Sequence, residues 1–148
     1  MKSLFAALKF LSILPIPQIW AGEDNCLSNS VKFFPVVGLI IGTIIAGCSW
    51  LLGFGIPHMV VAAITVILIA ILTRGLHLDG LADTADGFYS VSNKERTLEI
   101  MKDSFIGAMG VIAIASVLLL KLACLASLEK DMLWRGVLLM VLSGRCMM

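Results

Sequence analysis

Residues 33–55 read FFPVVGLIIGTIIAGCSWLLGFG and contain no charged side chain. A helix needs about 20 mostly apolar residues to cross the hydrocarbon core of a bilayer, so this run predicts a transmembrane helix. Within it, Gly38, Gly42 and Ala46 recur at every fourth position. Such a ladder of small residues allows a second helix to approach closely. An equal alternative is that ordinary packing merely tolerates small residues at these positions.

The composition of the whole chain agrees with a membrane protein. Of its 148 residues, 59% are hydrophobic and 14% are charged, and the mean hydropathy is +1.02. A soluble domain needs more polar surface. The net charge of +1 provides no basic field for nucleic acid, so we expect no nucleic-acid partner. The cysteines have no C-x-x-C spacing, and we expect small buried hydrophobic residues, not disulfides or a zinc site, at Cys26, Cys48, Cys124 and Cys146.

Three more apolar runs predict membrane segments at residues 58–73, 105–128 and 132–148. The run near the N-terminus is too short to cross, because Pro15 and Pro17 end it. We therefore expect an interfacial or re-entrant helix within residues 1–20, anchored by Trp20. The predicted fold is all-α, a polytopic transmembrane helical bundle that forms one membrane domain over residues 1–148.

Residues 74–104 hold most of the charge and form the acidic segment between two predicted spans. The cytoplasmic side of a membrane protein is enriched in Lys and Arg. The turn after the first span has neither, whereas the side that holds the acidic segment has Lys32, Arg74, Lys94, Arg96 and Lys102. We therefore expect this segment to face the cytoplasm.

Two further features flank the acidic segment. Ser92 and Glu95 match a capping box, which predicts a helix that begins near Asn93 and runs on into the third span. Lys121 lies within that span, where it either extends to the interface or faces the interior of the bundle.

Three aspartates, Asp79, Asp83 and Asp86, are spaced i, i+4, i+7 and would share one face of a helix. Three neighbouring carboxylates repel one another unless a cation lies among them, and oxygen ligands suit Mg²⁺, which also binds substrate phosphates. An ordinary solvated loop is the alternative. Two glycines, Gly80 and Gly87, would permit close approach of a cofactor or substrate. Two basic residues, Arg74 and His77, could bind phosphate oxygens, and Asp103 could be a further metal ligand. For Arg74 and Lys94 a simpler role is that of a membrane-side anchor.

The run from Thr73 to Gly87, TRGLHLDGLADTADG, closely resembles the signature of the cobalamin synthase family, the adenosylcobinamide-GDP ribazoletransferases. Three other blocks are similar in order and spacing: FLSILPIP at residues 10–17, FFPVVGLIIG at 33–42 and EIMKDSFIGAMG at 99–110. Family members are longer, and SGR at 143–145 resembles the start of a further block. The resemblance thus implies that the chain corresponds to an N-terminal portion.

The resemblance implies a reaction at the cytoplasmic (inner) membrane. Alpha-ribazole, or its 5′-phosphate, is joined to adenosylcobinamide-GDP, GMP leaves, and adenosylcobalamin or its phosphate forms, late in vitamin B12 synthesis. The family uses magnesium, for which Asp79, Asp83 and Asp86 are the expected ligands. Arg74 or His77 would then steady a phosphate oxygen, and Asp86 or Asp103 would accept the ribazole hydroxyl proton. The expected partners are the two substrates and the lipid bilayer. A second copy of the chain, or other enzymes that assemble the nucleotide loop, would be further partners.

Other functions stay open at this point. A CDP-alcohol phosphotransferase would have an arginine shortly after its Asp-Gly pair, where this chain has Thr84 and Ala85. A membrane prenyltransferase would have a second aspartate-rich motif. A transport protein would place its carboxylates and Lys121 along an ion path at mid-membrane. An inactive truncated form is a further alternative.

Overall fold

The computed structural model describes residues 2–17, 30–89, 94–101 and 105–147. Within these ranges every regular element is helical and no strand occurs, which confirms the all-α prediction. The elements are α1 (Lys2–Leu11), α4 (Phe34–Leu52), α5 (His58–Leu72), α6 (Leu76–Tyr89), α7 (Lys94–Ile100), α8 (Ala108–Ala126) and α9 (Leu133–Cys146), with 3-10 turns at Val31–Phe33 and Lys130–Met132.

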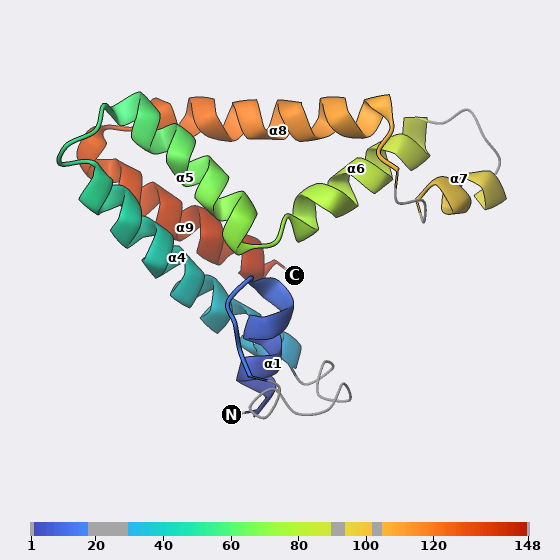
Figure 1. Ribbon diagram of the computed structural model, residues 1–148, viewed down its shortest axis with the longest axis horizontal. Coiled ribbons are helices and arrows are strands. Elements are labelled where there is room, and N and C mark those ends of the chain that lie inside the picture. Colours follow the sequence, from blue (N-terminus) through green and yellow to red (C-terminus); the bar gives the residue numbers. More distant parts are fainter. Residues whose placement is uncertain (1, 18–29, 90–93, 102–104, 148) are drawn as a thin grey trace.

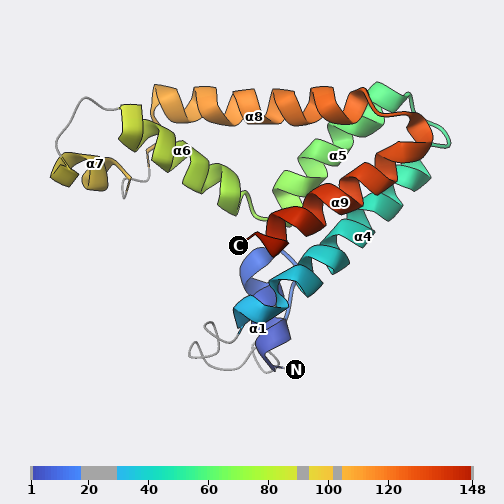
Figure 2. The ribbon, with the colours of Figure 1, turned by 180° about the vertical axis from the view of Figure 1, so that it is seen from behind.

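Helices α4 and α9 lie side by side in antiparallel orientation (Figures 1 and 2). A methyl group added to Gly38 would lie 2.9 Å from Cβ of Arg145, and one added to Gly42 would lie 3.2 Å from Cδ1 of Leu138. Ala46, the third small residue of the ladder, is also buried. The small residues therefore bring two helix backbones close together, as the first of the two sequence interpretations predicts.

A continuous apolar core lies among α1, α4, α5 and α9. The segment that follows α1 is tied to the end of α5, because the amide of Ile13 donates a hydrogen bond of 3.0 Å to the carbonyl oxygen of Leu72. The rings of Phe10 and Phe34 stack with centroids 6.4 Å apart. The most deeply buried core side chains are Ala7, Leu11, Val37, Ile41, Ile45, Val61, Ala62, Val137 and Val141.

Helices α5, α6 and α8 enclose a triangle in Figure 1. The axis of α6 is bent by 85° from that of α5. The intervening turn contains two residues with left-handed backbone angles, Arg74 at φ 55° and Gly75 at φ 65°. This conformation suits glycine, which has no Cβ, and is unfavourable for arginine. The sharp turn directs the aspartates of α6 away from the α4–α5–α9 core.

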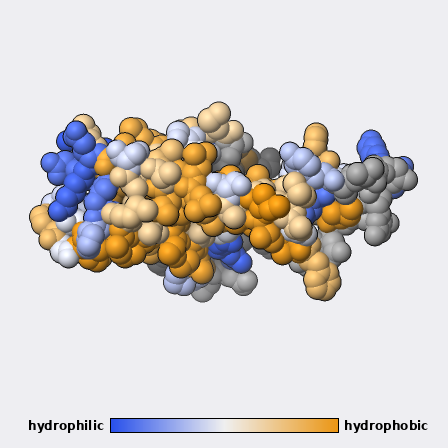
Figure 3. Space-filling model, turned by 90° about the horizontal axis from the view of Figure 1, so that it is seen from above, coloured by the Kyte–Doolittle hydropathy of each residue, from blue (hydrophilic) through white to orange (hydrophobic). Residues whose placement is uncertain are grey.

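Two helical segments are long and apolar enough to cross a membrane, Val31–Leu52 and Ala108–Ala126, and α5 with α6 would make a third if the bent pair counts as one span. Most of α8 is exposed apolar surface, as expected where lipid covers a helix. Figure 3 shows apolar side chains over most of the middle of one face, with hydrophilic side chains gathered at one end. Helices α5 and α9 form where the segments 58–73 and 132–148 were expected, and their crossing of the bilayer stays a prediction.

Two sequence predictions are wrong. The helix expected to run from near Asn93 into the third span is divided, because α7 ends at Ile100 and α8 begins at Ala108 after an extended Gly107 (φ −88°, ψ 176°). The cysteines within the described ranges were expected to be buried, but their helices turn these positions outward and the side chains are exposed: Cys48, Cys124 and Cys146. Cys26, Trp20, Asn93 and Asp103 lie outside the described residues.

Candidate active site

The predicted carboxylates lie on α6, where the helix brings Asp79, Asp83 and Asp86 to one face. Asp79 is exposed, and Asp83 and Asp86 are half-buried. The segment is therefore a regular helix and not a solvated loop.

Asp86 binds the start of α8. Its carboxylate accepts hydrogen bonds from the amide of Gly107 at 2.7 Å and from the amide of Gly110 at 2.8 Å. These amides belong to the N-cap and to the first turn of α8, and Gly107 has no side chain with which to cap the helix. A negative charge at this end also interacts favourably with the helix dipole. A methyl group on either glycine would overlap the Asp86 carboxylate, so a side chain at either position would displace that carboxylate.

Asp79 and Asp83 have no hydrogen bond or ion pair with the described part of the chain. They lie one helical turn apart, and a methyl group added to Gly80 between them would meet no atom within 4 Å. Asp79 is exposed beside this open space, where water, a cation or a substrate has access, and Asp83 is half-buried next to it. No group of three His, Cys, Asp or Glu side chains arranged for a metal ion occurs in residues 2–17, 30–89, 94–101 and 105–147. The assignment of three aspartate ligands to a metal therefore stays a prediction.

Gly87 allows α7 to pack on α6. A methyl group at Gly87 would lie 2.6 Å from Cγ of Met101 and 3.3 Å from Cγ2 of Thr97. Residues of α7 and the position after it therefore occupy the space that a side chain at Gly87 would fill, whereas the space beside Gly80 is open. The role of Gly80 and Gly87 beside a cofactor or substrate stays a prediction, and the open space at Gly80 suits it better than the packed surroundings of Gly87.

His77 lies on roughly the opposite side of α6 from Asp79 and Asp86, because each helical residue advances about 100° around the axis. It lines a cavity of about 330 Å³ together with residues of α5, α8 and α9. Partial burial of the imidazole lowers the pKa of His77, and the positive charges of Arg145 and Lys121 lower it further. The other lining residues are Ile69, Lys121, Met140, Val141, Gly144 and Arg145.

Arg145 is the functional candidate that sequence reasoning missed. It retains 6% of its accessible surface, and its Nε and Nη2 atoms are buried without a hydrogen-bond partner in the described chain. Its place depends on Gly38 of α4, which leaves room for the arginine stem. Lys121 of α8 lines the same cavity, so it faces the interior of the bundle, one of the two expected positions. Arg74, in contrast, is exposed in the α5–α6 turn and does not line this cavity.

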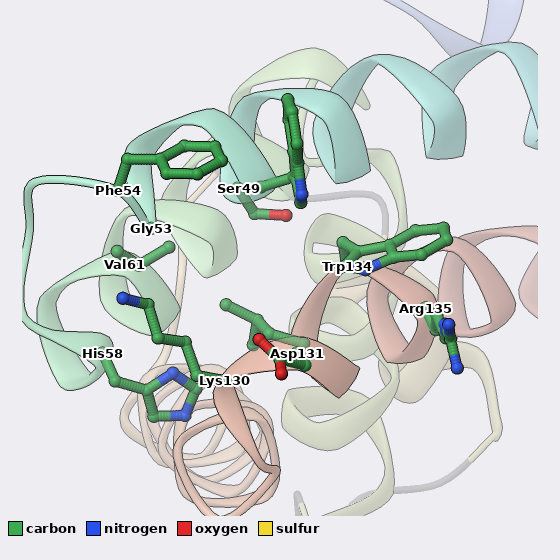
Figure 4. A pocket seen from close by; sticks show the side chains of 11 residues that line it. Ser49, Gly53, Phe54, His58, Val61, Lys130, Asp131, Trp134 and Arg135 are labelled. Atoms are coloured by element: carbon green, nitrogen blue, oxygen red, sulfur yellow. The ribbon is translucent and has the colours of Figure 1, made fainter.

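Another cavity, of about 310 Å³, lies where the α4–α5 and α8–α9 connections meet. Figure 4 shows the side chains of Lys130 and Asp131 beside His58, while Arg135 extends away from them. The guanidinium of Arg135 lies 5.1 Å from the ring centroid of Trp134. Figure 1 places these connections at the end of the molecule remote from α7, so this cavity is separate from the aspartates of α6.

Comparison with known proteins identifies the family. Residues 3–148 match the family described as cobalamin-5-phosphate synthase. The chain belongs to this family. The match includes all of α6 and therefore the aspartates, His77 and the cavity residues.

Curated relatives of the chain, including the three that follow, are named adenosylcobinamide-GDP ribazoletransferase. The protein of Geotalea daltonii is 42% identical over 88% of this chain and 53% of its own length. That of Roseiflexus sp. is 47% identical over 81% of this chain and 45% of its own length. That of Desulforamulus reducens is 42% identical over 97% of this chain and 57% of its own length. The chain thus spans about half the length of these relatives. No solved structure matches it.

Proposed function

We propose that the chain carries the metal-binding and phosphate-binding part of an enzyme that joins alpha-ribazole, or its 5′-phosphate, to adenosylcobinamide-GDP. GMP is released, and adenosylcobalamin or its 5′-phosphate is formed at the end of cobalamin biosynthesis. The observation that carries the proposal is the match to relatives named for this reaction, which extends over 97% of the chain in one of them. The carboxylates of Asp79 and Asp83 on α6 support it, because pyrophosphate-linked substrates need a cation at the reacting centre.

Asp79 and Asp83 are the proposed principal magnesium ligands. Mg²⁺ usually takes one or two carboxylates and completes its coordination with water and substrate phosphates, and a free pair beside the open space at Gly80 suits that requirement. Asp103 is the further ligand that the sequence motif suggests. When bound, the ion would neutralise pyrophosphate charge and stabilise the departing GMP.

Asp86 has a different proposed role from the other two aspartates. Both of its oxygens accept amide hydrogen bonds from α8, so they are poorly available to take the ribazole hydroxyl proton. We assign it to positioning: it holds the first turn of α8 against α6 and so fixes the wall of the site. Of the two bases considered for the proton, this leaves Asp103.

We further propose that α6 lies at the cytoplasmic side of the cell membrane. The first turn of α4 and the last turn of α5 lie at the same end of the bundle (Figure 1), so Lys32 and Arg74 belong to one side. That clustering of basic residues supports a cytoplasmic assignment. An ion path would need carboxylates buried at mid-membrane, and the exposure of Asp79 speaks against it.

The test is product formation in a longer protein. In a chimera, residues 3–148 of this chain replace the matching part of the Desulforamulus reducens relative. Membranes that contain the chimera are supplied with adenosylcobinamide-GDP, alpha-ribazole and Mg²⁺, and released GMP and the corrinoid product are measured. We expect both products in equal amounts. A chimera that inserts to the same level as the intact relative but yields neither product contradicts the proposal.

A further inference from the structure

We infer that Arg145, Lys121 and His77 form a binding site for a phosphomonoester group, in the cavity among α5, α6, α8 and α9. The inference deepens the proposed function and rests on it for the ligand, the 5′-phosphate of alpha-ribazole 5′-phosphate. This site needs no metal and is distinct from the carboxylate pair.

The cavity is lined by a buried charge that has no partner among the described residues. Arg145 is 6% exposed, and two of its guanidinium nitrogens are buried without a hydrogen-bond partner among the described residues. An arginine stays protonated in proteins, and a buried charge without a partner is costly. Its neighbours on α4 and α9 are apolar or glycine, such as Val141 and Gly38. An anion that enters the cavity would supply the missing partner.

A second cation reaches the same space from another helix. Lys121 of α8 and Arg145 of α9 both line the cavity, and no acidic residue of the described chain does. The cavity measures about 330 Å³, roughly ten times the volume of about 30 Å³ that one water occupies in the liquid. It therefore has room for a phosphate group and part of the molecule attached to it.

A phosphomonoester group matches these cations in charge and in geometry. A phosphomonoester carries a charge of about −1.5 to −2 at neutral pH and offers three strong acceptor oxygens. Arg145 and Lys121 together balance that charge, and a guanidinium can bind two phosphate oxygens at once. His77 adds a ring nitrogen from the side of α6 that faces away from Asp79 and Asp86. The helix would thus bind two anionic groups, one through a metal and one through cations.

A phosphomonoester can come from a soluble nucleotide or from a lipid such as phosphatidic acid, and both have the same recognition chemistry. The first experiment therefore uses the chain in detergent micelles without phospholipid, Mg²⁺ or donor. Inorganic phosphate, alpha-ribazole 5′-phosphate and alpha-ribazole are titrated, and binding is measured by calorimetry and by the midpoint of thermal unfolding. We expect the 5′-phosphate to bind at least tenfold more tightly than alpha-ribazole.

Matched variants locate the site. Arg145→Gln and Lys121→Gln should each weaken binding of the 5′-phosphate at least tenfold, and Arg145→Lys should retain part of it. Arg135→Gln, on the same helix but outside the cavity, should bind normally. Gly144→Leu should block the cavity without removing a cation, because Gly144 lines it. The backbone can carry the new side chain, since a Cβ at Gly144 meets nothing within 4 Å. Gly47→Leu, where a Cβ also meets no atom within 4 Å, is its control. Circular dichroism and size-exclusion chromatography verify that each variant is folded.

In the second experiment, nanodiscs that contain either phosphatidylcholine alone or added phosphatidic acid are compared. If added phosphatidic acid weakens nucleotide binding by wild type, and leaves the weaker binding by Arg145→Gln unchanged, the result supports the phosphate site and shows that lipid can also occupy it. Absence of binding by any phosphomonoester, or equal loss in Arg135→Gln, overturns the inference. These binding experiments contain neither donor nor Mg²⁺, so they do not depend on the transfer reaction. If the chimera fails to transfer while the chain still binds the 5′-phosphate, the result counts against the proposed function alone.

Discussion

Asp79, Asp83 and Asp86 share one face of α6 but have different surroundings. Asp79 and Asp83 have no partner in the described chain, whereas Asp86 accepts two amide hydrogen bonds from α8. A carboxylate at a helix N-terminus satisfies amides that have no partner within the helix. At the scale of single residues, one aspartate therefore serves structure, while the other two are available for chemistry.

Replacement of Asp86 with alanine should lower the free energy of unfolding by about 1–2 kcal/mol, because the first turn of α8 loses its cap. Denaturant titration in detergent micelles, followed by circular dichroism, measures this loss. Asp79→Ala is the control and should change stability little, since that side chain is exposed. Equal stability of the two variants would show that the Asp86 hydrogen bonds contribute nothing.

The candidate residues on α6 could be found from sequence, and the residues across the cavity could not. The i, i+4, i+7 spacing and the glycines mark the aspartates locally. Arg145 is a single arginine near the end of an apolar run, and its burial depends on contact with Gly38, far away in the sequence. The hydrogen bonds of Asp86 to Gly107 and Gly110 also depend on tertiary packing, which no local pattern contains.

At the scale of elements, the central contact of the bundle is that between α4 and α9. Gly42→Leu should separate the two helices, because even a methyl group there would lie 3.2 Å from Leu138. Overpacking of this kind costs about 1–3 kcal/mol. Gly47→Leu, on the same helix with no atom within 4 Å, should leave stability nearly unchanged. Thermal unfolding in micelles compares them, and similar midpoints would contradict close α4–α9 packing.

Helix positions followed from sequence better than helix breaks did. The charge-free run at residues 33–55 contains α4, and the run at 58–73 matches α5 closely, because apolar length is a local property. The break before α8 was missed, although Gly107 and Gly110 lie there, because their role depends on Asp86 of another helix. The 85° bend between α5 and α6 likewise depends on left-handed angles at Arg74 and Gly75.

At the scale of the whole molecule, α6 is proposed to lie at one membrane face and the α8–α9 turn at the other. With the four native cysteines replaced by serine, Thr84→Cys should react with a membrane-impermeant maleimide only in inside-out vesicles. Lys130→Cys should react only in intact cells or spheroplasts. Both positions are exposed. Reaction of Thr84→Cys from outside would reverse the proposed orientation.

Asp79 and Asp83 of α6 are proposed to hold the magnesium ion needed for transfer to adenosylcobinamide-GDP. GMP release by the chimera, measured as Mg²⁺ is titrated, tests this proposal most directly. Asp79→Asn and Asp83→Asn should each lower turnover at least about 100-fold, since a charge-stabilising interaction at the reacting centre is removed. Raised Mg²⁺ should recover part of the activity. Unchanged turnover and unchanged Mg²⁺ dependence in both variants would contradict the account.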